Sequence, residues 1–289
     1  MIKKTWNQLI EKEKEDVIRY IESCHDNVFN RSRETQIRAI EGMTYGSGDQ
    51  YFVFFEGDMI IGTVGVILKE VAPQGIAYIN ELRGTQSTEL RKHLVDFAKD
   101  MCIKSGAREV KVGLLERHDE FIPQLVEGGF SYVHSLVELN KCNRELYEDA
   151  VAIDLLTLDH AEAFATIMTE AFKDSPNGAT VTVEDAKKQA EENDLCGVIS
   201  VDSTAVGAFE LTLKDEIGWI DTLAVAPTNQ NKGYGKLLFR SVQNYLWEHG
   251  AKELKMCVFD TNKIAFDLYL KHGFTRGQLL SKWYSLHPK

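Results

Sequence analysis

The sequence predicts an α/β protein built from two tandem copies of one mixed unit. Stretches whose apolar residues alternate with period two are interspersed with stretches of period 3.6, which indicates strands mixed with helices. The order of these stretches in the second half recurs in the first half. Short segments of the two halves also match each other at a nearly constant offset, which favours a duplication.

The second half gives the clearest order of elements. Apolar periodicity and turn residues predict each of them in turn. The expected elements are a short strand 150–158, a helix from an Asp159 N-cap to Phe172, a helix 183–193, strands 195–201, 205–213 and 217–225, a helix 235–249, a strand 253–259, a helix 262–272 and a last strand near 275–285.

The first half repeats this order with a shorter third connection. YFVFF and MIIGTVGVIL flank a turn at Glu56-Gly57-Asp58 and predict a hairpin. IAYINEL (76–82) matches IGWIDTL (217–223) at an offset of 141 residues, whereas SGAREVKV matches HGAKELKM at an offset of 144. The first copy has therefore lost three residues between its third strand and the next helix. The polar stretch 141–150 divides the copies, so we expect domains 1–145 and 146–289.

Composition limits the class of protein. The 289 residues carry a formal net charge of −11, which argues against broad binding of nucleic acid or anionic membranes. The N-terminus lacks the apolar core of a signal peptide, and no apolar run approaches the roughly 20 residues that a membrane helix needs. Five scattered cysteines without a C-x-x-C pair indicate reduced thiols and no metal site. We therefore expect a cytoplasmic protein.

One stretch, NQNKGYGKLL (229–238), stands between a predicted strand and a predicted helix. The first N–H groups of a helix lack intrahelical partners and carry partial positive charge, so they bind anions. Gly233 and Gly235 let an anion approach the backbone without meeting a Cβ atom. The P-loop pattern is absent, and Leu238 replaces the third glycine of the dinucleotide pattern. The stretch alone is equally compatible with an ordinary turn.

Two motifs together resemble the GCN5-related N-acetyltransferase (GNAT) superfamily. The first is Q-x-x-G-x-G from Gln230 to Gly235, preceded by a strand ending in LAVAP. The second is N-x-x-A-x-x-x-Y-x-x-x-G-F from Asn262 to Phe274. The resemblance covers essentially all of 151–289 and, without the cofactor motif, residues 1–140. It implies two tandem GNAT-like domains, each with a mixed, mostly antiparallel sheet, a splayed pair of parallel strands and flanking helices.

The resemblance implies acetyl-CoA as the co-substrate and no metal. Backbone groups of strand residues would pair with the pantetheine arm, and backbone N–H groups of the glycine loop would hold the pyrophosphate. A further pair of residues, later in the chain, would line the cofactor side of the cleft. In this order the expected residues are Leu223, Ala224 and Val225; Gln230, Asn231, Lys232, Gly233, Tyr234, Gly235 and Lys236; and Asn262 and Phe266.

Tyr269 is the expected general acid, because a positioned phenol can protonate the departing thiolate. The alternative is a packing role. Asp221 and Glu210 are candidates for the general base, although strand carboxylates are more often solvated or ion-paired. Asp221 is somewhat better placed, with a neutral Asn80 at the matching position of the first copy.

The first copy lacks these groups. At an offset of 144, Gly233, Gly235, Asn262 and Tyr269 correspond to four residues that suit neither phosphate binding nor proton donation: Glu89, Arg91, His118 and Leu125. We therefore expect a degenerate N-terminal domain and a catalytic C-terminal domain.

The expected function is transfer of an acetyl group to a primary amine of a small molecule or peptide by direct attack. A non-catalytic acyl-CoA-binding sensor or interaction module is the alternative from another class, and an enzyme resembling mycothiol synthase is a further one. Acceptor choice is expected to depend on the early helices and on loops such as 172–185. No nucleic acid or membrane partner is expected, and the protein could be a monomer or a homodimer.

Overall fold

The chain forms two compact units in the computed structural model, which describes residues 1–24, 32–84, 87–173, 180–192 and 195–288. Unit 1 comprises Met1–Leu136 together with Leu279–Lys289, and unit 2 comprises Val137–Gln278. The chain thus passes into unit 2 within strand β6 (Ser131–Lys141) and returns to unit 1 within strand β12 (Thr275–Leu286). The compact units are defined by contacts in space and have other bounds than the duplicated copies in sequence. The expected division between residues 145 and 146 concerns the copies and stays a prediction.

Unit 1 is a mixed sheet with helices on both faces. Its strand order is β1-β2-β3-β4-β5-β12, in which only β4 and β5 run parallel among the pairs with a described register. Its further elements are β1 (Ile2–Thr5), α1 (Glu11–Ser23), α2 (Arg33–Glu41), β2 (Tyr51–Glu56), β3 (Met59–Ile67), α3 (Val71–Gln74), β4 (Ile76–Arg83), α4 (Thr88–Lys104), β5 (Glu109–Leu115) and α5 (Ile122–Glu127), with 3-10 turns η1 (Trp6–Gln8), η2 (Met43–Tyr45) and η3 (Glu116–Phe121).

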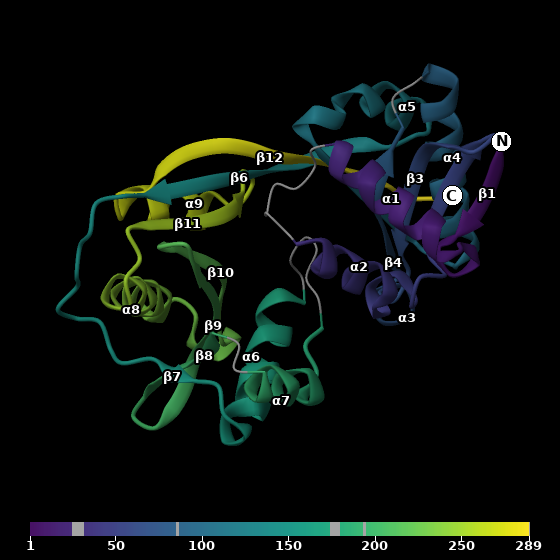
Figure 1. The fold of residues 1–289 in the computed structure, drawn as a ribbon. Helices are drawn as coiled ribbons and strands as arrows, with labels where there is room; N and C mark the ends of the chain where they lie inside the picture. Colours follow the sequence, from purple (N-terminus) through teal and green to yellow (C-terminus); the bar gives the residue numbers. More distant parts are fainter. Residues whose placement is uncertain (25–31, 85–86, 174–179, 193–194, 289) are drawn as a thin grey trace. The chain divides into compact units, whose positions relative to one another are not determined.

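Unit 2 repeats this plan with the strand order β6-β11-β10-β9-β8-β7, in which β10 and β11 run parallel. Figure 1 shows α8 on one side of the strands β8, β9 and β10, and α6 with α7 on the other. The elements are β7 (Asp154–Leu155), α6 (Ala161–Phe172), α7 (Val183–Glu191), β8 (Cys196–Val201), β9 (Thr204–Lys214), β10 (Ile217–Val225), α8 (Tyr234–Glu248), β11 (Glu253–Phe259) and α9 (Lys263–Lys271), with 3-10 turns η4 (Leu158–His160) and η5 (Pro227–Asn229).

Alternation along the strands explains the two cores of unit 2. Leu223 packs in the cluster that includes residues of α8 and α9, whereas its neighbour Ala224 belongs to the cluster under α6. A strand presents successive side chains to opposite faces, so each strand contributes to both cores. Burial of apolar area on both faces, at about 25 cal/mol per Å², is the main force that holds the helices in place.

The α/β class and the recurrence of one element order in the two halves are confirmed. One expected strand is much shorter than predicted, because only Asp154 and Leu155 of the stretch 150–158 are in strand register with β8, followed by one bond from the Leu156 N–H to the Cys196 carbonyl (2.9 Å). The backbone before them bonds to α8 instead, where the Val151 N–H donates to Ser241 Oγ (3.0 Å), and the residues after them enter η4.

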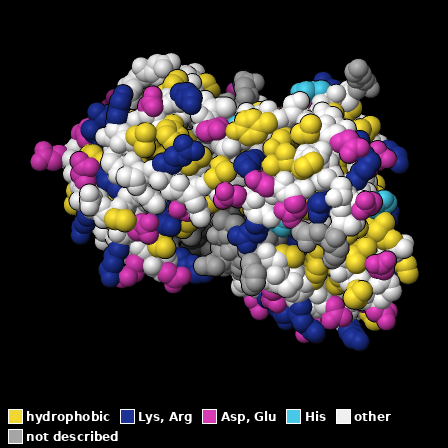
Figure 2. Space-filling view, turned by 90° about the horizontal axis from the view of Figure 1, so that it is seen from above, with side chains coloured by type: hydrophobic (Ala, Val, Ile, Leu, Met, Phe, Trp, Pro, Cys, Tyr) yellow, Lys and Arg dark blue, Asp and Glu magenta, His cyan; other side chains and the backbone are white. Residues whose placement is uncertain are grey.

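Charged side chains of both signs are interspersed on the face that Figure 2 shows, so the net negative charge does not gather in one patch there. Among the described residues, no helix is both long and apolar enough to cross a membrane.

Candidate active site

The parallel strands of unit 2 separate part-way along their length. β10 and β11 are in register from Ile217 opposite Glu253 to Ile220 opposite Met256, and no described pair joins them beyond that point. β10 nevertheless continues to Val225 and β11 to Phe259. The backbone of β10 after Ile220 therefore presents unpaired groups toward β11, and an extended ligand can bond to such an edge as an added strand would.

A β-bulge marks the point of separation. On the β9 side, Ile220 lies opposite Leu211, but Thr222 lies opposite Glu210, which leaves Asp221 as the extra residue. Thr212 Oγ1 donates to Asp221 Oδ2 (2.8 Å), and Thr222 Oγ1 donates to Glu210 Oε2 (2.7 Å). Because Thr212 and Glu210 are alternate residues of β9, both contacts lie on one face of the sheet. The bulge thus aims two consecutive side chains at this face.

The two carboxylates on this face differ in how they are held. Both oxygens of Glu210 accept hydrogen bonds, one from Thr222 and the other from Gln189 Nε2 of α7 (3.0 Å). Asp221 accepts only from Thr212 among the described residues. Loss of hydration raises the pKa of Asp221, Thr212 opposes this shift, and the nearby Glu210 carboxylate adds to it. A carboxylate with a free oxygen and a raised pKa is the better proton acceptor of the two.

The loop after β10 ends in a helix without a side-chain cap. Gly233 stands at the N-cap of α8 with φ +89°, a conformation that favours glycine. Lys236 and Leu237 donate their N–H groups back to the Gly233 carbonyl, both at 3.1 Å. The five preceding N–H groups, of residues 231–235, make no hydrogen bond within the described part of the chain. Five free donors at the positive end of a helix are suited to binding an anion.

Some of the expected loop side chains stabilise the loop itself, and others lie at its surface. Gln230 Nε2 donates to the Val225 carbonyl (3.3 Å), and Lys232 Nζ donates to Asn229 Oδ1 (3.3 Å), so both stabilise the turn. Asn231 has φ +60°, Tyr234 is half-buried against the core, and Lys236 is exposed. The positive charge and the donors therefore stand at the same end of α8.

Gly235 gives a clean test of the anion site, because a Cβ atom there would meet only Val225 Cγ2 at 3.7 Å. Replacing Gly235 with Val is expected to leave the melting temperature within about 2 °C. Acetyl-CoA binding should weaken at least about tenfold, because the new side chain covers the free N–H groups. Calorimetric titration measures this affinity, and Gly235→Ala serves as the smaller control. Unchanged affinity in the Val variant would remove the loop from the site.

Helix α9 carries the second motif. Asn262 is its N-cap, and its Oδ1 accepts from the Ala265 N–H (3.2 Å), which leaves its amide nitrogen free to donate to a ligand. Phe266 is half-buried in the core. Tyr269 packs its ring on Phe239 with centroids 4.9 Å apart, and burial raises the pKa of its phenol to about 12. The phenol therefore carries its proton at neutral pH, as a general acid must.

The matching helix of the first copy is capped by its own chain. β4 and β5 also separate after four residue pairs, and a bulge at Asn80 corresponds to the one at Asp221. There, however, Ser87 Oγ caps α4 by accepting from the Leu90 N–H (3.0 Å), and Glu89 lies in the first turn. A capped N-terminus beside a carboxylate repels an anion.

The face of the first copy that corresponds to Asp221 and Glu210 is filled by its own side chains. Glu81 accepts from Tyr51 and from Thr63 (2.9 Å), and it forms an ion pair with Arg83. Gly65 stands where the second copy has Glu210, and a Cβ atom there would lie 2.6 Å from the ring of Tyr45. The positions of Asn262 and Tyr269 are taken by the buried residues His118 and Leu125.

Sequence reasoning missed the polar partners of the two carboxylates. Thr212, Thr222 and Gln189 hold Asp221 and Glu210, yet none belongs to a motif. The alternation of β9 could have placed Thr212 on the face of Glu210. Nothing local signals that Gln189 of α7 reaches that strand. Of the expected acceptor loop 172–185, residues 174–179 lie outside the described part of the chain.

Comparison with known proteins identifies the family of the second unit. Residues 155–274 match the model described as "Acetyltransferase (GNAT) family". This segment is a GNAT acetyltransferase domain. It contains the separated strands, the uncapped helix and Tyr269, and membership of this family indicates acyltransferase activity in general. No curated protein matches the chain.

The GNAT fold extends over the whole chain. A GCN5-related N-acetyltransferase from Sphaerobacter thermophilus superposes with a TM-score of 0.70 at 16% identity, over 99% of this chain and 96% of that one. A putative acetyltransferase from Pyrococcus horikoshii gives 0.67 at 12% identity, over 100% and 89%. A tandem GNAT protein from the clavulanic acid biosynthesis pathway gives 0.56 at 11% identity, over 83% of each chain. At these identities the likeness concerns the fold alone.

GNAT proteins generally use acetyl-CoA, and the free edge of β10 followed by the bare N-terminus of α8 fits an extended pantetheine arm that leads to a pyrophosphate. Within the described residues, no group of three or more His, Cys, Asp or Glu side chains could hold a metal ion.

Proposed function

We propose that the protein transfers an acetyl group from acetyl-CoA to a primary amine of a small molecule or peptide, and that the C-terminal copy is the catalytic one. The observation that carries this proposal is the contrast between the two copies. Unit 2 has five free N–H groups at the start of α8 and a protonated phenol on α9, whereas unit 1 has Ser87, Glu89 and Leu125 at the matching places.

The reaction is a direct transfer. The donor supplies an activated thioester, whose carbonyl carbon bonds to the amine nitrogen as the carbon–sulfur bond breaks. Asp221 takes the proton that the ammonium must lose before it attacks, and Tyr269 gives its phenolic proton to the departing sulfur. The second proton, which the nitrogen loses after the carbon–nitrogen bond has formed, passes to the phenolate or to water. The free edge of β10 from Leu223 to Val225 orients the donor, and the N–H groups of 231–235 hold its anionic end. Proton exchange with water then restores both side chains.

Asp221 and Glu210 have separate tasks in this proposal. Asp221 is the base, because one of its oxygens is free among the described residues. Glu210 supports the acceptor side, because it joins β9 to Thr222 of β10 and to Gln189 of α7. Neither carboxylate forms an ion pair with a described Lys, Arg or His, so their charge favours a cationic acceptor. We further propose a cytoplasmic protein that binds neither nucleic acid nor membrane.

Acidic pH is expected to abolish the reaction through Asp221. The carboxylate must be ionised to accept a proton, so kcat/KM falls as pH drops through its pKa, which lies above the usual carboxyl range. Asp221→Asn should lower kcat/KM about 10²-fold at neutral pH and remove this acidic limb. A pH profile of CoA release checks both effects. An unchanged limb in the variant would assign the base to another group.

Titration with acetyl-CoA and a panel of amines tests the proposal as a whole. One equivalent of bound acetyl-CoA and amine-dependent CoA release are expected. Tight binding without CoA release by any amine would contradict the proposal and support a non-catalytic acyl-CoA sensor. Two equivalents would contradict the assignment of a degenerate first copy.

A further inference from the structure

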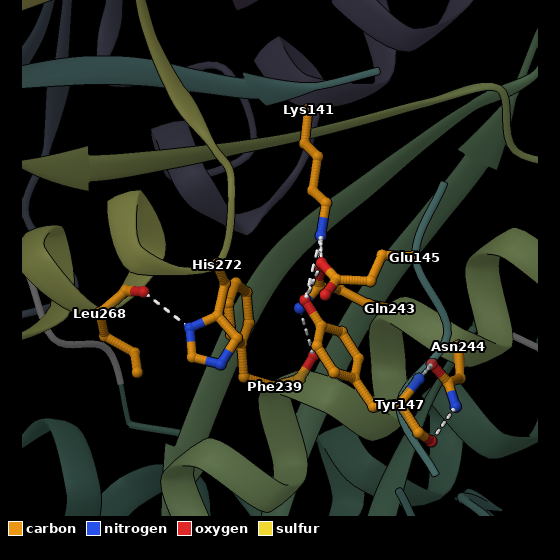
Figure 3. Close-up of polar contacts among 8 residues, drawn as sticks. All are labelled: Lys141, Glu145, Tyr147, Phe239, Gln243, Asn244, Leu268 and His272. Carbon is orange, nitrogen blue, oxygen red and sulfur yellow. Dashed lines mark hydrogen bonds and ion pairs between the residues drawn. The ribbon is translucent and has the colours of Figure 1, made fainter. Parts of the chain in front are cut away.

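A buried lysine of unit 2 stands apart from the residues assigned to the reaction. Lys141 is the last residue of β6, and its side chain is only 2% exposed. Its Nζ donates to Glu145 Oε2 (3.0 Å), to the Tyr147 hydroxyl (3.0 Å) and to Gln243 Oε1 (3.1 Å), as Figure 3 shows. All three ammonium protons are thus used. A buried ammonium is tolerated only when it is paired in this way, and loss of its partners is costly.

The segment after Lys141 is bound along α8. The Tyr147 N–H donates to Asn244 Oδ1 and Asn244 Nδ2 donates back to the Tyr147 carbonyl, both at 2.9 Å. Asp149 forms an ion pair with Arg240, whose guanidinium also lies over the Tyr147 ring at 4.8 Å. The polar stretch that separates the two copies is therefore held against the helix whose N-terminus forms the anion site.

A short chain of contacts leads from Lys141 to Tyr269. Gln243 accepts from Lys141 and donates its own Nε2 to the Phe239 carbonyl, one turn earlier in α8 (3.1 Å). The buried Phe239 ring contacts Tyr269 at 4.9 Å and His272 at 5.4 Å between centroids. Figure 3 shows Gln243 between Lys141 and Phe239, and His272 beside the Phe239 ring. The orientation of this turn of α8 thus bears directly on the position of the phenol.

The stem of Lys141 also supports the end of α9. A Cβ atom on Gly273 would lie 3.5 Å from Lys141 Cε, and Gly273 itself has φ +80°. The Tyr147 ring lies 5.8 Å from that of His272, the residue before Gly273. Lys141 therefore touches, directly or through one partner, both α8 and the C-terminal end of the helix that carries Tyr269.

We propose that Lys141 is a positioning residue, which fixes α9 against α8 and so places the Tyr269 phenol for proton donation. This inference rests on the proposed function. β6 is the last strand of the first copy in sequence. The non-catalytic copy therefore contributes a residue that positions α9 of the catalytic copy. The anion site at the start of α8 lies about 14 Å along the helix from Gln243, at 1.5 Å per residue, so donor binding is expected to be independent of Lys141.

The test is Lys141→Met in the full-length chain, since Met keeps the apolar stem under Gly273 and removes the charge. Lys271→Met, at an exposed lysine in the last turn of α9, is the matched control. The affinity for acetyl-CoA should stay within about threefold, while kcat falls about 10–100-fold, as expected when an interaction made only in the transition state is lost. A merely structural lysine would not give this separation of affinity from kcat.

A double-mutant cycle with Tyr269→Phe decides whether Lys141 acts through the phenol. In the native background we expect Tyr269→Phe to cost at least about 10²-fold in kcat. In the Lys141→Met background this cost should shrink by the same factor of about 10–100 that Lys141→Met itself costs, so that the double variant is no slower than Tyr269→Phe alone, because residues that act as a unit are not additive. Equal costs in both backgrounds would overturn the proposal. If Lys141→Met does not fold, Gln243→Met takes its place in the cycle, because it breaks the contact with Phe239 while Lys141 keeps Glu145 and Tyr147.

Amide hydrogen exchange separates this proposal from the proposed function. If no amine is acetylated by the native protein, the proposed function fails, but Lys141 can still be tested without turnover. Lys141→Met should speed exchange in α9 (263–271) and leave residues 236–239 of α8 protected as in the native chain. Equal exchange of α9 in the variant and the native protein would overturn the positioning role on its own.

Discussion

Replacing Tyr269 with Phe is expected to lower kcat by about 10²–10⁴-fold, the range typical for loss of a general acid. No described residue shares a hydrogen bond with the Tyr269 hydroxyl, so its removal leaves no polar group unpaired. The ring keeps its contact with Phe239, and the variant should therefore fold and bind acetyl-CoA like the native protein. Steady-state CoA release with a saturating amine measures the effect.

The control for this substitution is Tyr245→Phe, in α8. Tyr245 is also half-buried, but its ring stacks on His249 with centroids 3.8 Å apart and has no place in the reaction. Removal of the Tyr245 hydroxyl should leave kcat unchanged. Native turnover in Tyr269→Phe would show that Tyr269 is a packing residue and that another group or water protonates the thiolate.

A fragment of residues 146–289 is expected not to fold, although it contains the whole family motif. Unit 2 begins at Val137, and the fragment lacks the part of β6 that lies beside β11. It also carries residues 281–286 of β12, whose partner is β5 of unit 1. The fragment therefore loses one strand and exposes another as an unpaired apolar edge, which favours aggregation.

A fragment of residues 137–278 is the matched comparison, because it corresponds to unit 2 as the structure bounds it. We expect this second fragment to melt cooperatively by circular dichroism and to bind acetyl-CoA, in contrast to 146–289. The last strand of each copy completes the sheet of the other unit, since β6 lies beside β11 and β12 beside β5. A cooperative transition and native affinity in the 146–289 fragment would contradict this exchange of last strands.

The sequence by itself determined the elements and motifs of the second copy. The bounds expected for β10 and β11, 217–225 and 253–259, are those of the structure, because period-two alternation and the flanking turns are local signals. The glycine loop, the start of α8 and the N-cap Asn262 are likewise written in consecutive residues. The duplication followed from the matching segments, and the GNAT family is confirmed for residues 155–274.

The arrangement around the two carboxylates was decided by the tertiary structure. The two-residue turn at Asp215 and Glu216 sets a register that would place Glu210 opposite Asp221, but the bulge after Ile220 puts Thr222 there instead. The first copy has a bulge at the matching position, where the neutral Asn80 stands. Repulsion between two carboxylates therefore cannot explain the bulge in both copies. A bulge depends on pairing across strands and has no marker along the chain.

The exchange of last strands and the burial of Lys141 are also outside the reach of local sequence. β12 follows the second copy along the chain, yet its residues 281–286 pair with β5, about 170 positions earlier. Lys141 lies in a polar stretch that reads as a connection, and only its contacts with Gln243 and Gly273 assign it to the packing of α8 and α9. Local periodicity specifies which residues form a helix or strand, whereas contacts between distant segments specify which side chains meet.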